Sequence, residues 1–351
     1  MTVEILHGDM LDILPTLPEA SFSSCVTDGP YGLRFMGKRW DYDVPSVAQW
    51  QAVLRVLKPG AILAAFGGSR TSHRLACNIE DAGFDLRDTI AWLYGTGKPK
   101  ADGQLKPSHE PILLARAPFT GTEQACVAEH GTGLRIDDCR IPYASAEDRE
   151  ASKHWGKAVS RVGGLGVADR RERPKQEFVP GEQRGRWPAN VILTCACEDH
   201  EGAPDDDCPV RLLDEQSGEL KSGGNVRNRR ADKHRNAFGT FKGERVEHFT
   251  RPPDFKGGAS RFFYCAKAAP SERGRFNTHP TVKPIALMRY LVRLVTPPGG
   301  RVLDCFFGSG TTGLACRLEE RPCVGIEREA GSIEIARKRM AQGSLDFGAA
   351  S

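Results

Sequence analysis

The chain lacks long apolar runs and a dense cysteine framework. No hydrophobic stretch approaches the ~18 residues that a transmembrane helix needs. The first residues, MTVEILHGDMLDIL, lack the basic segment and apolar core of a signal peptide. The 11 cysteines are odd in number and scattered over 351 residues, which is typical of reduced thiols. We therefore expect a cytoplasmic protein and exclude the secreted, membrane and fibrous classes.

A strong net charge is also absent. The 49 Lys and Arg residues against 45 Asp and Glu residues leave +4, so composition alone does not indicate a nucleic-acid binder. Between residues 118 and 261, however, acidic and basic blocks alternate and cancel. Two basic stretches there, Arg170–Arg173 and Arg227–Arg235, are candidate phosphate contacts, although solvated surface loops show the same pattern.

Both ends of the chain alternate between strand and helix patterns. Apolar runs bounded by turn residues predict buried strands, and apolar residues at helical spacing predict the helices between them. This order predicts an α/β fold with a doubly wound, mostly parallel, Rossmann-like sheet. The Gly-rich, irregular residues between them predict a long insertion. The clearest elements are the strands Phe22–Thr27, Ala61–Phe66, Arg301–Cys305 and Cys323–Ile326 and the helices Val47–Val56 and Ile285–Val295.

A Gly-rich turn follows the strand that ends at Cys305. Its sequence, Gly308-Ser309-Gly310-Thr311, lets the backbone approach a ligand closely and opens a helix whose N–H groups face that ligand. No Gly-Lys-Ser/Thr follows, so phosphate transfer is disfavoured. Glu327 ends the next strand, where an acidic side chain can accept both hydroxyls of a ribose. The turn alone also occurs as a purely structural feature, but together with the acid it indicates an adenosine-containing cofactor.

A second turn, Asp28-Gly29-Pro30-Tyr31, follows the strand Phe22–Thr27 at a carboxyl end, where α/β sheets bind ligands. An exocyclic amine of adenine or cytosine is a poor nucleophile, because its lone pair is delocalised into the ring. Asp28 and the Gly29 carbonyl can accept its two N–H bonds and so localise the lone pair, while Tyr31 stacks on an extruded base. The same residue types also form ordinary β-turns.

These motifs resemble those of S-adenosylmethionine-dependent DNA amino-methyltransferases. Asp28-Gly29-Pro30-Tyr31 is similar to their Asp-Pro-Pro-Tyr motif, and Phe306-Phe307-Gly308-Ser309-Gly310-Thr311-Thr312 to their cofactor motif. The catalytic motif comes first, which resembles the circularly permuted β group, including its phage-type members. The resemblance implies catalytic residues Asp28, Gly29, Pro30 and Tyr31. It implies cofactor-binding residues Asp9, Asp28, Thr281, Lys283, Asp304, Phe306, Gly308, Ser309, Gly310, Thr311 and Glu327.

The same resemblance implies a division of the chain into three parts. Residues 1–117 would form the catalytic half and residues 262–351 the cofactor-binding half of one methyltransferase fold, with a target-recognition region at 118–261 between them. The expected substrate is double-stranded DNA, within restriction-modification, and the Asp-initiated motif favours adenine N6 over cytosine N4. Methylation of RNA or of a protein glutamine amide stays open. A homodimer also stays open, and we expect no nuclease in this chain and no membrane partner.

One residue departs from the family pattern. Gly29 stands where the family usually has proline, which weakens the pre-organisation of its carbonyl and leaves open a cofactor- or DNA-binding regulator without catalysis.

A cluster of possible metal ligands lies in the middle stretch. Cys195, Cys197, His200 and Cys208 place three thiols and an imidazole within fourteen residues. Zinc accepts such a ligand set, so zinc is a candidate cofactor. The spacing is not that of a standard zinc knuckle, and free thiols are the alternative.

Overall fold

The computed structural model describes residues 2–34, 37, 41–95, 103, 105–152, 184–195, 208–218, 220–221, 235–236, 239–240, 256–267 and 282–341. The chain divides into two compact units. The larger comprises Met1–Arg140, Trp187–Leu212 and Phe263–Ser351, and the smaller comprises Ile141–Arg186 and Leu213–Phe262.

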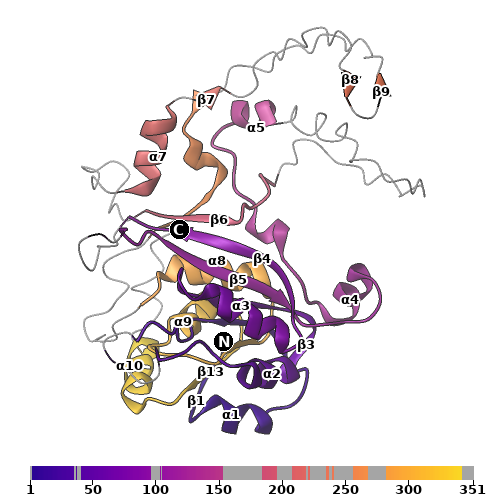
Figure 1. Ribbon diagram of the computed structural model, residues 1–351, viewed down its shortest axis with the longest axis vertical. Helices are drawn as coiled ribbons and strands as arrows, with labels where there is room; N and C mark the ends of the chain where they lie inside the picture. The colour runs from indigo at the N-terminus through magenta and orange to yellow at the C-terminus, as the bar shows by residue number, and fades with distance from the viewer. Residues whose placement is uncertain are drawn as a thin grey trace. The chain divides into compact units, whose positions relative to one another are not determined.

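A nine-stranded sheet forms the centre of the larger unit (Figure 1). Neighbouring strands are parallel except around β5, which runs antiparallel to both of its neighbours. In spatial order the strands are β1 (Val3–His7), β13 (Cys323–Glu327), β12 (Val302–Asp304), β2 (Phe22–Thr27), β3 (Leu57–Phe66), β5 (His109–Arg116), β4 (Asp85–Leu93), β6 (Val191–Cys195) and β11 (Tyr264–Lys267). Because β1, β13, β12 and β2 are parallel neighbours, the turns that follow them meet at one edge of the sheet.

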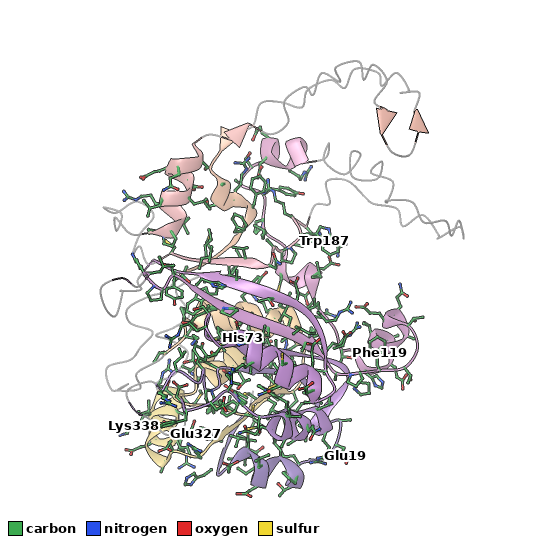
Figure 2. All side chains as sticks on the ribbon, in the orientation of Figure 1. Glu19, His73, Phe119, Trp187, Glu327 and Lys338 are labelled. Atoms are coloured by element: carbon green, nitrogen blue, oxygen red, sulfur yellow. The ribbon has the colours of Figure 1, made fainter. Side chains whose placement is uncertain are left out.

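Helices cover both faces of this sheet, and side chains fill the space between the layers (Figure 2). Strand β3 contributes to the packing on both faces: Ile62 and Ala64 belong to one hydrophobic core, and Leu63 and Ala65 belong to the other. A strand buried on both faces reads as a continuous apolar run. One core contains α1 (Met10–Ile13), the 3₁₀ turn Leu14–Thr16, α2 (Val47–Val56) and α3 (Ser72–Asp81); the other contains the 3₁₀ turn Ile136–Cys139, α8 (Ile285–Val295), α9 (Thr311–Leu318) and α10 (Ala330–Ala341).

The predicted fold class is confirmed, and several elements have the predicted bounds. Helix α2 illustrates the local cause: the Ser46 side chain accepts from the Gln49 backbone N–H, and the Gln49 side chain accepts from the Ser46 N–H. This capping box satisfies donors that the first helical turn leaves unpaired. Strand β2 and helix α8 also have the predicted bounds. The circular permutation remains a prediction.

Strand β6 departs from the expected organisation, because it lies inside the stretch that sequence analysis predicted to be an insertion. Residues Val191–Cys195 pair in parallel with β4 on one side and with β11 on the other. Helix α4 (Glu123–His130) also belongs to the larger unit. The irregular part of residues 118–261 is therefore interrupted by sheet structure, and the target-recognition role of this stretch remains a prediction.

The smaller unit is described only in part. A buried Asp148 organises one segment: it accepts from the Ala144 N–H at 3.0 Å and pairs with the Arg186 guanidinium. Arg170–Arg173 and most of Arg227–Arg235 lie outside the described residues. Its elements are α5 (Ala146–Ser152), β7 (Leu220–Lys221), β8 (Arg235–Asn236), β9 (Gly239–Thr240), β10 (Lys256–Gly257) and the 3₁₀ turn Ala259–Phe262. The helix α7 (Pro209–Ser217) spans the boundary between the two units. In the part of the chain that the structure covers, no helix is long and apolar enough to cross a membrane.

Candidate active site

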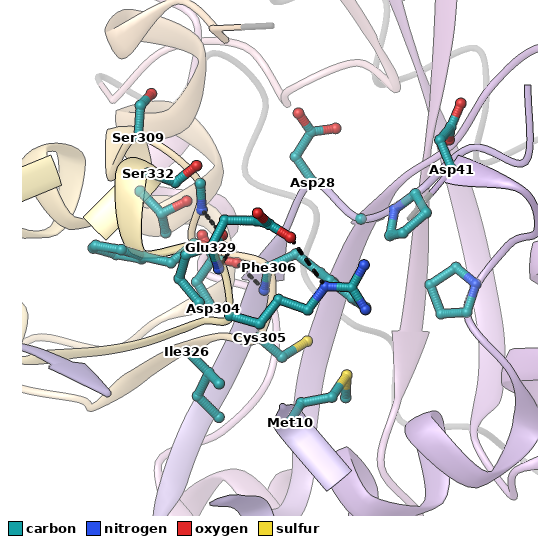
Figure 3. A pocket seen from close by; sticks show the side chains of 18 of the residues that line it. Met10, Asp28, Asp41, Asp304, Cys305, Phe306, Ser309, Ile326, Glu329 and Ser332 are labelled. Carbon is teal, nitrogen blue, oxygen red and sulfur yellow. Dashed lines mark hydrogen bonds and ion pairs between the residues drawn. The ribbon is translucent and has the colours of Figure 1, made fainter. Parts of the chain in front are cut away.

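A cavity of about 1200 Å³ opens at the carboxyl edge of strands β1, β13, β12 and β2 (Figure 3). Both motifs that sequence analysis singled out line it, because their strands are neighbours in the sheet. The predicted site residues in its wall are Asp9, Asp28, Gly29, Pro30, Tyr31, Lys283, Asp304, Phe306, Gly308, Ser309, Thr311 and Glu327. Thr281 lies outside the described residues.

Four polar side chains converge beside the Asp28 turn. The Lys283 ammonium donates to Asp28 Oδ2 at 2.7 Å and to the Tyr31 hydroxyl at 3.1 Å, and it lies 3.4 Å from Glu110 Oε2. The Tyr31 hydroxyl lies 2.9 Å both from Asp28 Oδ1 and from Glu110 Oε2. The Lys283 side chain is 9% exposed. One buried cation is therefore shared by two carboxylates.

The charges in this cluster determine the protonation states of Lys283 and Tyr31. Burial lowers the pKa of the Lys283 ammonium, but the attraction of Asp28 and Glu110 outweighs burial and raises that pKa overall. Burial, and then the charges of Asp28 and Glu110, raise the pKa of the Tyr31 phenol well above its usual value. Lys283 is therefore an ammonium and Tyr31 a neutral phenol at physiological pH.

Sequence analysis assigned Glu110 no role and placed Lys283 with the cofactor. The structure places Lys283 against Asp28, and Glu110 against both Lys283 and Tyr31. Glu110 lies in β5, whose antiparallel direction puts its first residues at the edge where its neighbour β3 ends. Glu110 belongs to neither of the two motifs that sequence analysis singled out.

The Gly-rich turn after β12 is held from both sides. Glu327 accepts the Gly308 N–H at 2.7 Å through Oε2 and the Glu329 N–H at 2.8 Å through Oε1. The buried Arg339 guanidinium donates to the Ser309 carbonyl at 2.8 Å and to the Thr311 hydroxyl at 2.9 Å. Glu327 is thus both a wall of the cavity and an anchor of the turn.

Gly310 supports this turn without lining the cavity. Its φ of +80° lies in the left-handed region, where glycine is favoured. A Cβ atom there would lie 3.0 Å from the Ala336 Cβ, so the helix α10 packs closely on this backbone. Gly310 caps α9, and the close packing fixes where the N-terminus of that helix points.

Asp304, at the end of β12, is a buried carboxyl with hydrogen bonds but no charged partner among the described residues. The Thr27 hydroxyl donates to Oδ1 at 2.7 Å, and the Phe306 N–H donates to the same oxygen at 3.1 Å. Burial nevertheless raises the pKa of Asp304 to about 6. The group is therefore mostly ionised, at a cost in free energy, above pH ~6.

Asp9 also lies in the cavity wall, where the chain leaves β1. Its Oδ1 accepts the Leu11 N–H at 2.9 Å and so caps helix α1. The preceding Gly8 N–H donates to the Glu327 carbonyl at 3.0 Å, which ties this turn to the end of β13. Asp9 and Glu327 therefore border the same part of the cavity.

The predicted zinc site gains no support. Cys208 and Cys195 are buried with their sulfur atoms 3.6 Å apart. Cys197 and His200 lie outside the described residues. Among the residues that are described, no three His, Cys, Asp or Glu side chains are grouped closely enough to hold a metal.

A doubly wound sheet with a Gly-rich turn and an acid around one cavity defines an α/β protein that binds its ligand at the strand carboxyl ends. The family model of DNA methylases, the N6/N4 methyltransferases, matches residues 22–338. This chain therefore belongs to the DNA methylase family.

Individual relatives agree with this family. The type II methyltransferase M.SmaI of Serratia marcescens is 46% identical over 63 residues, which are 18% of this chain and 22% of that protein. The type II methyltransferase M.BglI of Bacillus subtilis is 42% identical over 62 residues, 18% of each chain. These matches span about a fifth of the curated relatives.

A solved structure supports the fold. The PvuII DNA methyltransferase, described as cytosine-N4-specific, superposes with a TM-score of 0.52 at 14% identity, over 99% of this chain and 90% of that chain. At this identity the likeness shows the fold alone.

Proposed function

We propose that this protein transfers a methyl group from S-adenosylmethionine to an exocyclic amine of a base in double-stranded DNA. One observation carries the proposal beyond family membership: the Asp28 turn and the Gly-rich turn line the same cavity. A nucleophile held at the first would thus be within the same cavity as a cofactor held at the second. The type II names of the relatives favour a role in restriction-modification, with any nuclease on a separate chain.

The chemistry of the cavity wall fits the cofactor. Glu327 and Asp9 supply acceptors for ribose and adenine, and the Gly308 and Ser309 backbone permits close approach. Asp304 is a buried carboxyl for which the described residues provide no cation, and the cofactor carries a sulfonium and an ammonium group. When bound, the cofactor supplies an electrophilic methyl group.

The residues of the Asp28 turn prepare the nucleophile. The Asp28 carboxylate and the Gly29 carbonyl accept the two amine N–H bonds, which localises the lone pair on nitrogen, and the Tyr31 ring stacks on the base. The nitrogen forms its bond to the methyl carbon while the carbon–sulfur bond breaks and leaves its electron pair on sulfur. The surplus proton then leaves the nitrogen to solvent or through Asp28. Lys283 and the Tyr31 hydroxyl hold Asp28 in place, and Glu110 in turn holds both of them, so catalysis consists mainly of positioning and electrostatics.

The proposal favours adenine N6 over cytosine N4, because the motif begins with aspartate. The cytosine-N4 specificity of the PvuII enzyme belongs to that protein and does not decide the base here. Mass spectrometry of nucleosides from modified DNA distinguishes N6-methyladenine from N4-methylcytosine.

The test is label transfer from tritiated S-adenosylmethionine to unmodified DNA by the wild type and by Asp28→Ala. The wild type should label DNA, and the variant should lose at least ~100-fold of the rate, since it lacks an acceptor for the amine. Equal labelling by both would contradict the proposal. A parallel panel of RNA and ribosomal protein tests the two other amine substrates. Cofactor binding without transfer to any of the three would indicate a regulator.

A further inference from the structure

Asp41 binds the backbone of the turn that carries the catalytic motif. Its carboxylate accepts the N–H groups of Tyr31 at 2.7 Å and Gly32 at 3.0 Å through Oδ1, and of Leu33 at 3.2 Å through Oδ2. Its own carbonyl accepts the Arg34 N–H at 2.8 Å. One residue therefore holds four successive N–H groups that follow Asp28 and Pro30.

These hydrogen bonds are strong ones. Asp41 is 2% exposed, so water competes little for its oxygens, and bonds to an ionised acceptor exceed those between neutral groups. Successive backbone N–H groups also form concavities that bind anions. A further bond fixes the same turn from the opposite side, since the Thr71 hydroxyl donates to the Tyr31 carbonyl at 2.6 Å.

The turn needs such external support because of Gly29. A proline at this position would restrict the backbone by itself, whereas glycine does not. The packing also leaves little room for a side chain at position 29: a Cβ atom would lie 2.9 Å from the Phe306 ring and 3.3 Å from Pro45. The Phe306 ring, which belongs to the Gly-rich turn region, therefore packs directly on the Gly29 backbone.

We propose that Asp41 is a positioning residue whose carboxylate orders the turn Tyr31–Leu33 and thereby aims Asp28 and Tyr31 at the substrate base. Its hydrogen bonds supply the rigidity that glycine at position 29 does not provide. Figure 3 shows Asp41 and Asp28 on the wall of the same cavity. This inference rests on the proposed methyl transfer.

The test compares Asp41→Asn with Asp88→Asn in the full-length chain. Asp88 also accepts a backbone N–H, that of Thr89 at 2.7 Å, but it is exposed and does not line the cavity. Steady-state transfer from tritiated S-adenosylmethionine to DNA gives kcat, and calorimetric titration gives the cofactor Kd. We expect Asp41→Asn to lower kcat about 10- to 100-fold, because a small misplacement of catalytic groups costs that much. Its cofactor Kd should stay within about twofold of that of the wild type, since the cofactor turn keeps its own anchors.

Each result has one meaning for this inference. A kcat of Asp41→Asn equal to that of Asp88→Asn would overturn it, and so would a parallel loss of cofactor affinity or of the folded state, which would indicate a general structural role. Restored kcat in Asp41→Glu, which returns the carboxylate, would support it. If neither the wild type nor Asp88→Asn labels DNA, the proposed function itself fails, and that outcome is distinct from a failure of Asp41 alone.

Discussion

Replacement of Asp304 with asparagine should stabilise the folded protein near neutral pH. Burial raises the pKa of this carboxyl from 3.8 to about 6, despite hydrogen bonds from Thr312, Thr27 and the Phe306 N–H. The folded state therefore holds the proton more firmly than the unfolded state, so the stability that this group contributes is full below pH 3.8 and is lost as the pH rises through about 6. The interval between the two pKa values corresponds to about 3 kcal/mol. An amide of the same shape keeps Oδ1 as acceptor and cannot ionise.

The measurement is the free energy of unfolding in urea for the wild type and Asp304→Asn at several pH values. The variant's advantage should grow by about 2 kcal/mol between pH ~4.5 and pH ~8, because most of the unfolded-state titration precedes that of the folded state. Only the change of this difference with pH is compared, because an offset that is the same at every pH reports nothing about titration. If the difference does not change between these pH values, Asp304 titrates alike in both states and the reasoning is refuted.

Two further substitutions test the anchors of the site. Lys283→Met should lower the free energy of unfolding by about 3 kcal/mol at neutral pH, because it leaves two carboxylates without their cation. The pKa of the ammonium is raised from its usual 10.5, so its contribution to stability is present at neutral pH and is lost only in strong alkali. A loss below ~1 kcal/mol in urea unfolding would contradict this. Gly310→Ala should cost about 1–3 kcal/mol and weaken cofactor binding, because φ is +80° and the added carbon meets Ala336. Gly331→Ala, where nothing lies within 4 Å, is its control for stability alone, and equal thermal stability of the two variants would count against the argument.

Local sequence patterns predicted the fold well where the signal was itself local. Strand β2 and helices α2 and α8 have the expected bounds, because apolar runs, capping residues and Pro-Gly stops act within a few residues. Strand β6 was missed, since Val191–Cys195 is a short apolar run inside a charged, irregular stretch, and only pairing with β4 and β11 makes it part of the sheet.

The residues of the site show the same difference between local sequence signals and contacts that only the fold creates. The positions of Asp28 and Glu327 in the cavity wall could be predicted, because Asp28 follows one recognisable strand and Glu327 ends another. The partners of Asp28 could not, since Lys283 is 255 residues away in sequence and reaches it only through the folding of the sheet. Asp41 carried no motif signal at all, because its role consists of bonds to backbone N–H groups, which any sequence possesses.

Asp28 and Asp304 lie at the same edge of the sheet, but only Asp28 has a cation beside it. This difference indicates where a cationic ligand binds. Asp28 lies 2.7 Å from the Lys283 ammonium, whereas Asp304 has no cation among the described residues and the charge of Asp28 further raises its pKa. The positive charges of S-adenosylmethionine should therefore favour the ionised form of Asp304. With a pKa of about 6, about one tenth of this carboxyl is ionised at pH ~5, so the cofactor should bind about tenfold more weakly there than at pH ~8. Calorimetric titration at both pH values tests this, with Asp304→Asn expected to show no such dependence. An affinity of the wild type that is the same at both values would mean that the cofactor's charges are balanced by other groups.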